Sequence, residues 1–317
     1  MNYSINHRKE KGLQLIALKD EKSEAEVTVI PGYGALLHGF KVKAGDKQVD
    51  VIDHYEDLDQ LKNLLPTSFK SSKLSPFPCR IEEGKYSFDG IPYQFASKFL
   101  DGSAIHGLLF DKAFSIVDEK PGNDSAMIAL EYVYDRDDDQ YPFKYSCRIH
   151  YELLPEQVLS VETVLTNLGT SPMPIADGWH PYFSLGDKVD DWMLHFKAAA
   201  MIEFDDKLIP TGRLLDYEQF NQPALIGKTF LDNCFLINPD KTLASCEIFN
   251  PNNKLKVSFF PGKGYPYLQI YTPPHRNSIA IENLSSAPNS FNNKMGLTIL
   301  QPGQSESFGL QYKVSIL

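Results

Sequence analysis

Hydrophobic and polar residues alternate along most of this chain, as they do in strands that bury one face. The alternation is clear in three stretches near the beginning of the chain: residues 13–18, 25–30 and 36–42. Only residues 55–65 place apolar side chains at helical spacing, with Leu58, Leu61 and Leu65 on one face, and Pro66 is expected to end this helix. The pattern therefore predicts a chain made mostly of strands.

Short turns separate the predicted strands. Asp89-Gly90 lies between the strand-like residues 85–88 and 91–95, and this pair favours a hairpin because both turn positions tolerate positive φ. Further hairpin turns are expected at Gly45-Asp46, at residues 121–124 and at residues 155–157. In the last third of the chain, strands are predicted at residues 246–249, 254–260, 267–271, 279–282 and 308–314.

The 317 residues contain no evident linker, internal repeat or low-complexity segment. Many strands joined by short turns form antiparallel sheets, and all-β sandwiches often exceed ~200 residues as single units. We therefore predict an all-β fold, a large antiparallel β-sandwich, in which residues 1–317 form one domain.

The formal net charge is −10, and the acidic residues are spread along the chain. Because no basic stripe or polybasic run is present, neither nucleic acid nor an anionic membrane is expected as a partner, and a small neutral ligand fits better. The first nine residues lack the apolar core of a signal peptide, and no apolar run approaches the ~18 residues of a membrane helix. These features predict a cytoplasmic protein.

The four cysteines are too scattered for a CxxC metal site; they are Cys79, Cys147, Cys234 and Cys246. In a reducing compartment they are most simply free and partly buried thiols. No metal site is predicted from them.

Residues 177–183 place a single histidine, His180, among Trp179, Tyr182 and Phe183. An imidazole with an ordinary pKa near ~6.5 exchanges protons at neutral pH, and aromatic neighbours can fix its orientation. Pro181 keeps His180 out of helical geometry, which predicts a position at a strand end or in a loop that leads into a strand. The competing interpretation is a packed, hydrogen-bonded core histidine.

Five other polar residues stand out in strand-like or apolar surroundings: Arg80, His106, Asp232, Gln269 and Glu282. Each also has a structural interpretation, as a surface ion pair, a core histidine, a turn cap, an outward strand residue and an edge charge respectively. The common phosphate-loop, dinucleotide, HExxH and GxSxG patterns are absent from the sequence. The candidates must therefore be judged in combination.

Taken in order, six short motifs resemble those of the aldose 1-epimerase (galactose mutarotase) family. They are Pro78-Cys79-Arg80, His106-Gly107, His180-Pro181-Tyr182-Phe183, Leu231-Asp232-Asn233, Gln269-Ile270-Tyr271 and Ile281-Glu282-Asn283. The resemblance spans residues 13 to about 304 and implies an antiparallel β-supersandwich with an open sugar cleft. It implies that His180 is the general acid and Glu282 the general base. It further implies that four residues hold the sugar: Arg80, His106, Asp232 and Gln269.

This assignment agrees with the chemistry of anomer exchange. Ring opening needs one proton on the ring oxygen and the loss of another from the anomeric hydroxyl, so a protonated histidine and an ionised glutamate suffice without metal or coenzyme. We expect the two groups to face each other across a hexose such as glucose or galactose. Trp179, Tyr182 and Phe183 are candidates to stack against the sugar, although a core position fits Phe183 equally well. The protein is expected to be a monomer.

Two departures from the family pattern leave the substrate open. Cys79-Arg80 replaces the usual Asn-Arg, and His106-Gly107-Leu108 replaces the usual His-Gly-Gly. Lys70 and Lys73 raise a hexose-6-phosphate mutarotase as an alternative, unless they are solvated surface lysines. A non-catalytic sugar-binding sandwich is a second alternative, and a polysaccharide-cleaving enzyme fits poorly without paired catalytic carboxylates.

Overall fold

The computed structural model describes residues 1–96, 99–137, 139–238, 243–262 and 264–317. One sheet is formed by the first strands in chain order: β1 (Tyr3–Glu10), β2 (Leu13–Asp20), β3 (Glu26–Ile30), β4 (Leu36–Ala44) and β5 (Lys47–Asp50). The turn between β4 and β5 lies at Gly45-Asp46, as the sequence predicted.

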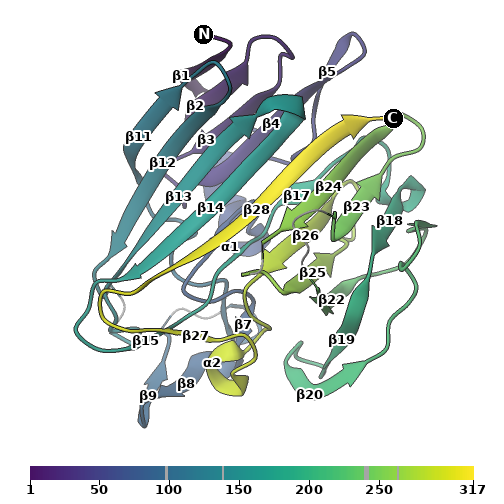
Figure 1. Cartoon of the computed structure of the whole chain (residues 1–317). Helices are drawn as coiled ribbons and strands as arrows, with labels where there is room; N and C mark the ends of the chain where they lie inside the picture. Colours follow the sequence, from purple (N-terminus) through teal and green to yellow (C-terminus); the bar gives the residue numbers. More distant parts are fainter. Residues whose placement is uncertain (97–98, 138, 239–242, 263) are drawn as a thin grey trace.

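A nine-stranded sheet crosses the whole molecule. Its strands, in spatial order, are β11 (Ser115–Pro121), β12 (Ala126–Tyr134), β13 (Tyr145–Leu154), β14 (Val158–Asn167), β28 (Ser305–Ile316), β24 (Leu255–Pro261), β23 (Cys246–Phe249), β18 (Met193–Phe196) and β21 (Ala224–Leu225). Figure 1 shows β12, β13, β14 and β28 as long neighbouring strands. The C-terminal strand β28 therefore lies between two hairpins and pairs with both: with β14 of the β13–β14 hairpin and with β24 of the β23–β24 hairpin.

An eight-stranded sheet carries most of the candidate residues. Its strands, in spatial order, are β20 (Pro210–Leu215), β19 (Ala198–Phe204), β22 (Asp232–Ile237), β25 (Tyr267–Tyr271), β26 (Ile279–Leu284), β16 (Gly178–Trp179) and β6 (Lys73–Leu74), and β17 (Tyr182–Phe183) also pairs with β26. The pairings of β22 with β25 and of β25 with β26 are antiparallel.

Short elements complete the described fold. Two-stranded sheets are formed by β7 (Arg80–Ile81) with β10 (Ala104–Ile105), by β8 (Lys85–Phe88) with β9 (Ile91–Gln94), and by β15 (Met173–Ile175) with β27 (Thr298–Leu300). The helical segments are α1 (Leu58–Ser68), α2 (Ser290–Asn293) and the 3-10 turns η1 (Glu82–Gly84), η2 (Pro155–Gln157) and η3 (Val189–Asp191).

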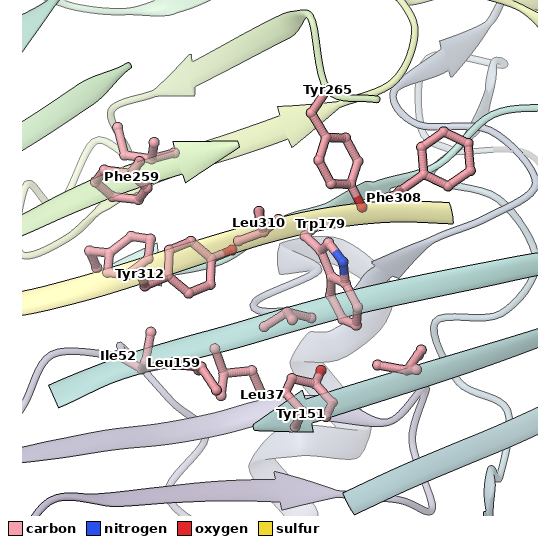
Figure 2. Close-up of a cluster of buried hydrophobic side chains, with 14 of the residues drawn as sticks. Leu37, Ile52, Tyr151, Leu159, Trp179, Phe259, Tyr265, Phe308, Leu310 and Tyr312 are labelled. Atoms are coloured by element: carbon pink, nitrogen blue, oxygen red, sulfur yellow. The ribbon is translucent and has the colours of Figure 1, made fainter. Parts of the chain in front are cut away.

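The main core lies between the sheets. Phe183 of β17 contacts Phe259 of β24 at 4.9 Å and Tyr312 of β28 at 5.4 Å between ring centroids. Figure 2 shows this core, in which the Tyr151 ring of the nine-stranded sheet lies 5.9 Å from the Trp179 ring between centroids. Apolar side chains at alternate strand positions bury one face of each sheet, so the predicted all-β antiparallel sandwich is confirmed.

The helix prediction needs one correction. Helix α1 begins after Asp57, whose carboxylate accepts the Gln60 N–H at 2.8 Å, and it continues through Pro66 to Ser68. Proline removes one backbone donor, but the last turn is closed by the Phe69 N–H, which donates to the Leu65 carbonyl at 3.0 Å. Burial of Leu65 holds this end in place.

The predicted hairpins at residues 89–90, 121–124 and 155–157 are all present. Strands β23 and β25 have the predicted bounds, and the four cysteines are buried and unpaired. No helix in the described part of the chain is long and apolar enough to cross a membrane. The single-domain organisation stays a prediction.

Candidate active site

The β16–β17 segment places alternate side chains on opposite faces. Trp179 and Phe183 point into the core, whereas His180 and Tyr182 lie on the other face, because side chains alternate along an extended chain. His180 lies between the two short strands, as the sequence predicted. Its backbone is held by the Ser72 carbonyl, which accepts the His180 N–H at 3.1 Å.

The register of the eight-stranded sheet brings three other candidates together. Gln269 on β25 lies directly opposite Glu282 on β26, and Asp232 begins the next strand, β22. Directly opposed residues have side chains on the same face, about 5 Å apart at Cβ. The Gln269 Nε2 donates to Asp232 Oδ1 at 2.9 Å, so these residues form a continuous polar row.

His180 and Glu282 meet at the centre of this group. The His180 Nε2 lies 3.3 Å from Glu282 Oε1, and the side chains are only 7% and 2% exposed. The Tyr182 ring stacks on the imidazole at 5.0 Å, and the His106 ring meets it edge-on at 4.9 Å. The imidazole is thereby fixed in orientation by two rings.

His106 and Arg80 reach the group from the small β7–β10 sheet. His106 has a positive φ of 57° and donates its N–H to the Cys79 carbonyl at 2.9 Å. Gly107 follows with φ of 77°, and a Cβ there would lie 2.2 Å from the Ser75 carbonyl oxygen. Only glycine fits this position, and it fixes the loop that presents His106.

Arg80 has a partner that the sequence did not predict. Its Nε donates to Asp101 Oδ2 at 2.7 Å, and Asp101 Oδ1 accepts the Ser103 N–H at 2.9 Å. Asp101 lies in an irregular turn without hydrophobic periodicity, so no sequence signal points to it. The pair fixes the guanidinium and leaves its two terminal nitrogens without a hydrogen bond to another described residue.

Several buried polar atoms in this group have no hydrogen-bond partner among the described residues. They are the Nδ1 atoms of His106 and His180, Oε1 of Gln269 and Oε2 of Glu282. Buried polar atoms are normally paired, so a cluster of unpaired ones indicates a place where a polar ligand completes the bonding.

Burial dominates the electrostatics of the pair. Burial raises the pKa of the Glu282 carboxyl well above its ordinary value, the Asp232 charge raises it further, and the Arg80 guanidinium lowers it. Burial lowers the pKa of His180 to about 4. Because desolvation penalises charge, burial shifts both groups toward their neutral forms, which are the unprotonated imidazole and the protonated carboxyl.

Burial works against the expected charge state of the pair, because it lowers the pKa of His180 and raises that of Glu282. The expectation that a hexose lies between the two groups is wrong for the ligand-free state, since a hexose does not fit between the ends of two side chains 3.3 Å apart. A sugar in contact with both must lie alongside the pair.

Two of the three expected stacking residues lie elsewhere. Trp179 is 3% exposed and packs against Tyr151 in the core, and Phe183 is fully buried against Phe259, as the core view in Figure 2 shows for Trp179 and its neighbours. Strand alternation explains both, since they face away from His180. Tyr182 is on the site face, where it supports the imidazole.

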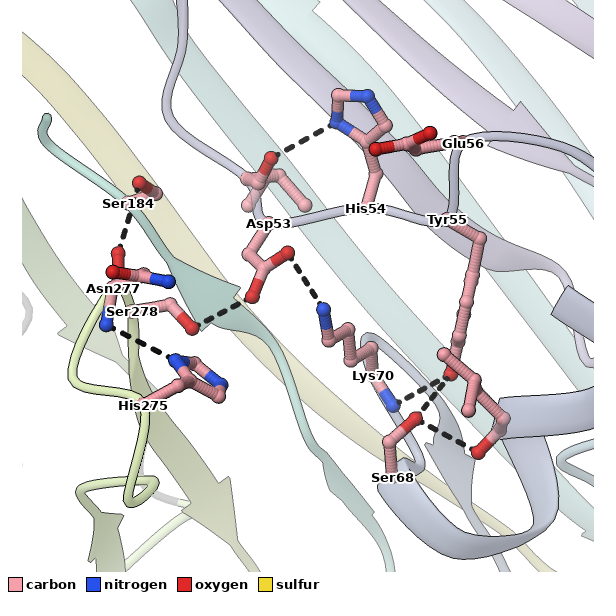
Figure 3. Close-up of polar contacts among 12 residues, drawn as sticks. Asp53, His54, Tyr55, Glu56, Ser68, Lys70, Ser184, His275, Asn277 and Ser278 are labelled. Atoms are coloured by element: carbon pink, nitrogen blue, oxygen red, sulfur yellow. Dashed lines mark hydrogen bonds and ion pairs between the residues drawn. The ribbon is translucent and has the colours of Figure 1, made fainter. Parts of the chain in front are cut away.

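Both candidate phosphate-binding lysines already pair with carboxylates. Lys73 is fully buried and its Nζ lies 2.6 Å from Asp177 Oδ2, so it is also not a solvated surface lysine. Lys70 lies 2.7 Å from Asp53 Oδ1, and Figure 3 shows this pair, with Ser278 donating to the other Asp53 oxygen. Both ammonium groups are neutralised by carboxylates.

The structure therefore gathers the predicted residues around the His180–Glu282 contact: His106 meets the His180 ring, and Asp232 and Gln269 lie on the same sheet as Glu282. Arg80 comes from the β7–β10 sheet and acts on Glu282 and Asp232 through its charge. No group of three or more His, Cys, Asp or Glu side chains among the described residues has the geometry to hold a metal ion.

The chain is similar to several known proteins. The chain is 29% identical over 248 residues to the uncharacterized protein YihR of Escherichia coli (strain K12), covering 76% of this chain and 77% of that one. The fold matches a galactose mutarotase-like protein from Clostridium acetobutylicum, with a TM-score of 0.89 at 18% identity and coverage of 100% and 99%. It also matches the galactose 1-epimerase of Lactobacillus acidophilus NCFM, with a TM-score of 0.82 at 16% identity and coverage of 99% of both chains.

The model of one protein family, described as aldose 1-epimerase, matches residues 14–313. Residues 14–313 include His180, Glu282 and the four other candidate residues. This chain belongs to the aldose 1-epimerase family.

Proposed function

We propose that this protein is an aldose 1-epimerase that interconverts the α and β anomers of a free hexose. The observation that carries the proposal is the buried contact of 3.3 Å between His180 Nε2 and Glu282 Oε1, surrounded by unpaired polar atoms. The role of each residue in the following steps is part of the proposal.

The reaction needs two proton transfers on neighbouring oxygens. His180 gives its Nε2 proton to the ring oxygen as the bond from that oxygen to the anomeric carbon breaks. Glu282 takes the proton of the anomeric hydroxyl, and the electron pair left on that oxygen forms the aldehyde carbonyl. Rotation about the adjacent carbon–carbon bond and reversal of both transfers give the other anomer.

The pKa directions favour ring opening by this pair. Ring opening converts a charged pair into a neutral imidazole and a protonated carboxyl, which is the arrangement that burial favours. The Arg80 charge lowers the pKa of Glu282 and so favours its ionised form. Arg80 thereby helps to return the pair to protonated His180 and ionised Glu282 before the next sugar ring opens. Each of the two transfers contributes a factor of about 10² to 10⁴ to the rate.

Four residues are proposed to hold the sugar: Arg80, His106, Asp232 and Gln269. The hydrogen bond between Asp232 and Gln269 orients both side chains. The Oε1 atom of Gln269 has no partner among the described residues, so it can accept a hydrogen bond from a sugar hydroxyl. Positioning of this kind is the second large contribution to rate.

A free hexose is favoured over a hexose 6-phosphate because both candidate lysines already pair with carboxylates. A purely sugar-binding protein is less well supported, since binding does not require a histidine and a glutamate in buried contact. The cytoplasmic location and the monomeric state stay predictions.

Polarimetry of freshly dissolved α-D-glucose and α-D-galactose tests the proposal. The protein is expected to accelerate the approach to equilibrium rotation for at least one of them, and to act less well on glucose 6-phosphate. If neither free sugar equilibrates faster than in buffer, the proposed activity is wrong. A strong preference for the phosphate would replace the free hexose as substrate.

A further inference from the structure

The outer face of the nine-stranded sheet carries a hollow of about 740 Å³. It spans β13, β14, β28 and β24, on the side opposite to the core residues Tyr151, Leu159 and Tyr312. We call it the outer hollow and define it by Glu152, Ser160, Glu162, Phe260, Gly309 and Gln311. None of these residues belongs to the His180 site.

Gly309 lies at the floor of the outer hollow, at a position where an added Cβ would meet no neighbouring atom. Gly309 is in the interior of the twelve-residue strand β28, its φ is not in the left-handed region, and a Cβ there would meet no atom within 4 Å. By contrast, a Cβ on the neighbouring Gly262 would lie 2.9 Å from the Gly309 carbonyl oxygen, so that glycine is required by the fold.

Glycine weakens a strand relative to a residue with a side chain, and it often marks a place where a ligand approaches the backbone. Nothing within the described chain requires a glycine at position 309. The missing side chain leaves a gap beside Glu162, its partner on β14. This gap, together with the hollow, indicates a ligand outside the sheet.

The strand register sets the shape of the surroundings. Gln311 lies opposite Ser160 on one side and opposite Phe260 on the other, and Ser160 lies opposite Glu152. Neighbouring strands are ~4.8 Å apart, so this row of four side chains is about 15 Å long. It ends at an aromatic ring that is half-buried.

The hydrogen-bonding groups along this row of side chains, and around it, indicate which class of ligand fits the outer hollow. Three carboxylates line the hollow and accept hydrogen bonds, those of Glu152, Glu162 and Glu306. Glu152 already accepts one from the Ser125 hydroxyl at 2.6 Å and Glu162 lies 3.6 Å from His150 Nδ1, and both carboxylates have further lone pairs for a ligand. Ser160 and Gln311 both donate and accept, and the Phe260 ring offers an apolar edge. A ligand with many hydroxyl donors and an apolar ring face satisfies all of them. We propose that the outer hollow is a second, non-catalytic site for a neutral oligosaccharide, with Gly309 as its floor.

The test uses sugars that cannot react at His180 and Glu282. Trehalose, sucrose and methyl β-D-cellobioside have no free anomeric hydroxyl, and each is titrated into ¹⁵N-labelled protein while the amide NMR signals are followed. At least one is expected to shift the signals of Gly309, Gln311 and Ser160. The same shifts are expected to disappear in Gly309→Val, whose side chain fills the gap.

Ser315→Val on the same strand is the matched control, because Ser315 does not line the hollow. It is expected to keep the shifts. Gly309→Val is expected to keep a thermal midpoint at least equal to that of the parent and a mutarotation rate within twofold of it. These readouts separate loss of the site from unfolding, and they separate this inference from the proposed activity.

Three results would overturn the proposal. The first is that none of the three sugars moves signals of the outer hollow. The second is that spermidine moves them and the sugars do not, which would make this a site for cations. The third is that light scattering shows a dimer that Gly309→Val dissociates, which would make the hollow a contact between two copies.

Discussion

The Lys73 ammonium lies 2.6 Å from the Asp177 carboxylate, and both side chains are fully buried beside the strand that leads to His180. Lys73 also donates to the Gly178 carbonyl at 3.1 Å, and Tyr265 donates its hydroxyl proton to the same Asp177 oxygen at 2.6 Å. This network fixes β16 against β6, and thereby fixes the backbone on which His180 is held.

Removing one partner of this pair is expected to be costly. Lys73→Met leaves Asp177 as an uncompensated buried charge, and loss of a buried partner costs about 3–5 kcal/mol of unfolding free energy. Urea unfolding measures the change. The double variant Lys73→Met, Asp177→Asn is expected to recover part of the loss, and a single-variant cost below about 1 kcal/mol would contradict this role.

Removal of either member of the catalytic pair is expected to abolish most of the activity. Glu282→Gln keeps the side-chain size and His180→Asn keeps a polar side chain, so sugar binding by calorimetry is expected to persist while kcat falls by about 10² to 10⁴. The double variant is expected to lose little more than one single variant, because the two groups act as a unit. Activity near that of the parent in both single variants would refute their assigned roles.

Asp101 is expected to act through Arg80. Asp101→Ala removes the carboxylate that accepts the Arg80 Nε proton at 2.7 Å, so the guanidinium loses its fixed orientation. We expect KM to rise by up to about tenfold, which corresponds to about 1.4 kcal/mol, with little change in kcat. Asp101→Asn keeps an acceptor and is expected to lie between the parent and Asp101→Ala.

Asp46→Ala in the exposed β4–β5 turn is the matched control for this measurement. It removes a carboxylate of the same size and is expected to leave both constants unchanged. An equal fall of kcat in both Asp101 variants, with KM unchanged, would argue against a positioning role.

His38 on β4, a buried histidine, predicts acid sensitivity. Burial, together with the charges of His54 and Lys41, lowers the pKa of His38 to about 3. Between about pH 6.5 and pH 3 the unfolded chain binds a proton at His38 that the folded protein does not bind, so this contribution to stability is lost as the pH falls. From pH 6.5 to pH 4 the loss is at most about 3 kcal/mol.

Other groups near His38 also titrate, so the comparison must be made with a variant. Burial raises the pKa of Asp50, so the folded protein binds a proton there at a pH at which the unfolded chain does not. The contribution of Asp50 to stability therefore increases as the pH falls toward its ordinary pKa, which is opposite to the contribution of His38. His38→Asn removes only the histidine. As the pH falls from 7 to 4, the unfolding free energy of the parent is expected to fall more than that of the variant, so the variant becomes more stable relative to the parent. A constant difference across this range would contradict the prediction.

The predictions that came true from sequence were those set by local chemistry. Asp89-Gly90 forms its hairpin because the turn positions themselves adopt positive φ, and β25 was found because its apolar residues alternate. The six motifs also contain the residues that lie around the His180–Glu282 contact, and the roles of these residues stay predictions. Helix α1 was misjudged at Pro66 because tertiary burial of Leu65 offsets one lost backbone bond.

The sequence by itself determined which segments become strands, since a period of two records which side of each strand is buried. It also determined, through its motifs, which polar residues are candidates for the site. Only the tertiary structure decided that Gln269 lies opposite Glu282, that Lys73 is buried against Asp177, and that Asp101 holds Arg80. Local patterns carry no information on which distant strands pair. The pKa values of His180 and Glu282 likewise depend on desolvation by neighbours that are distant in the chain.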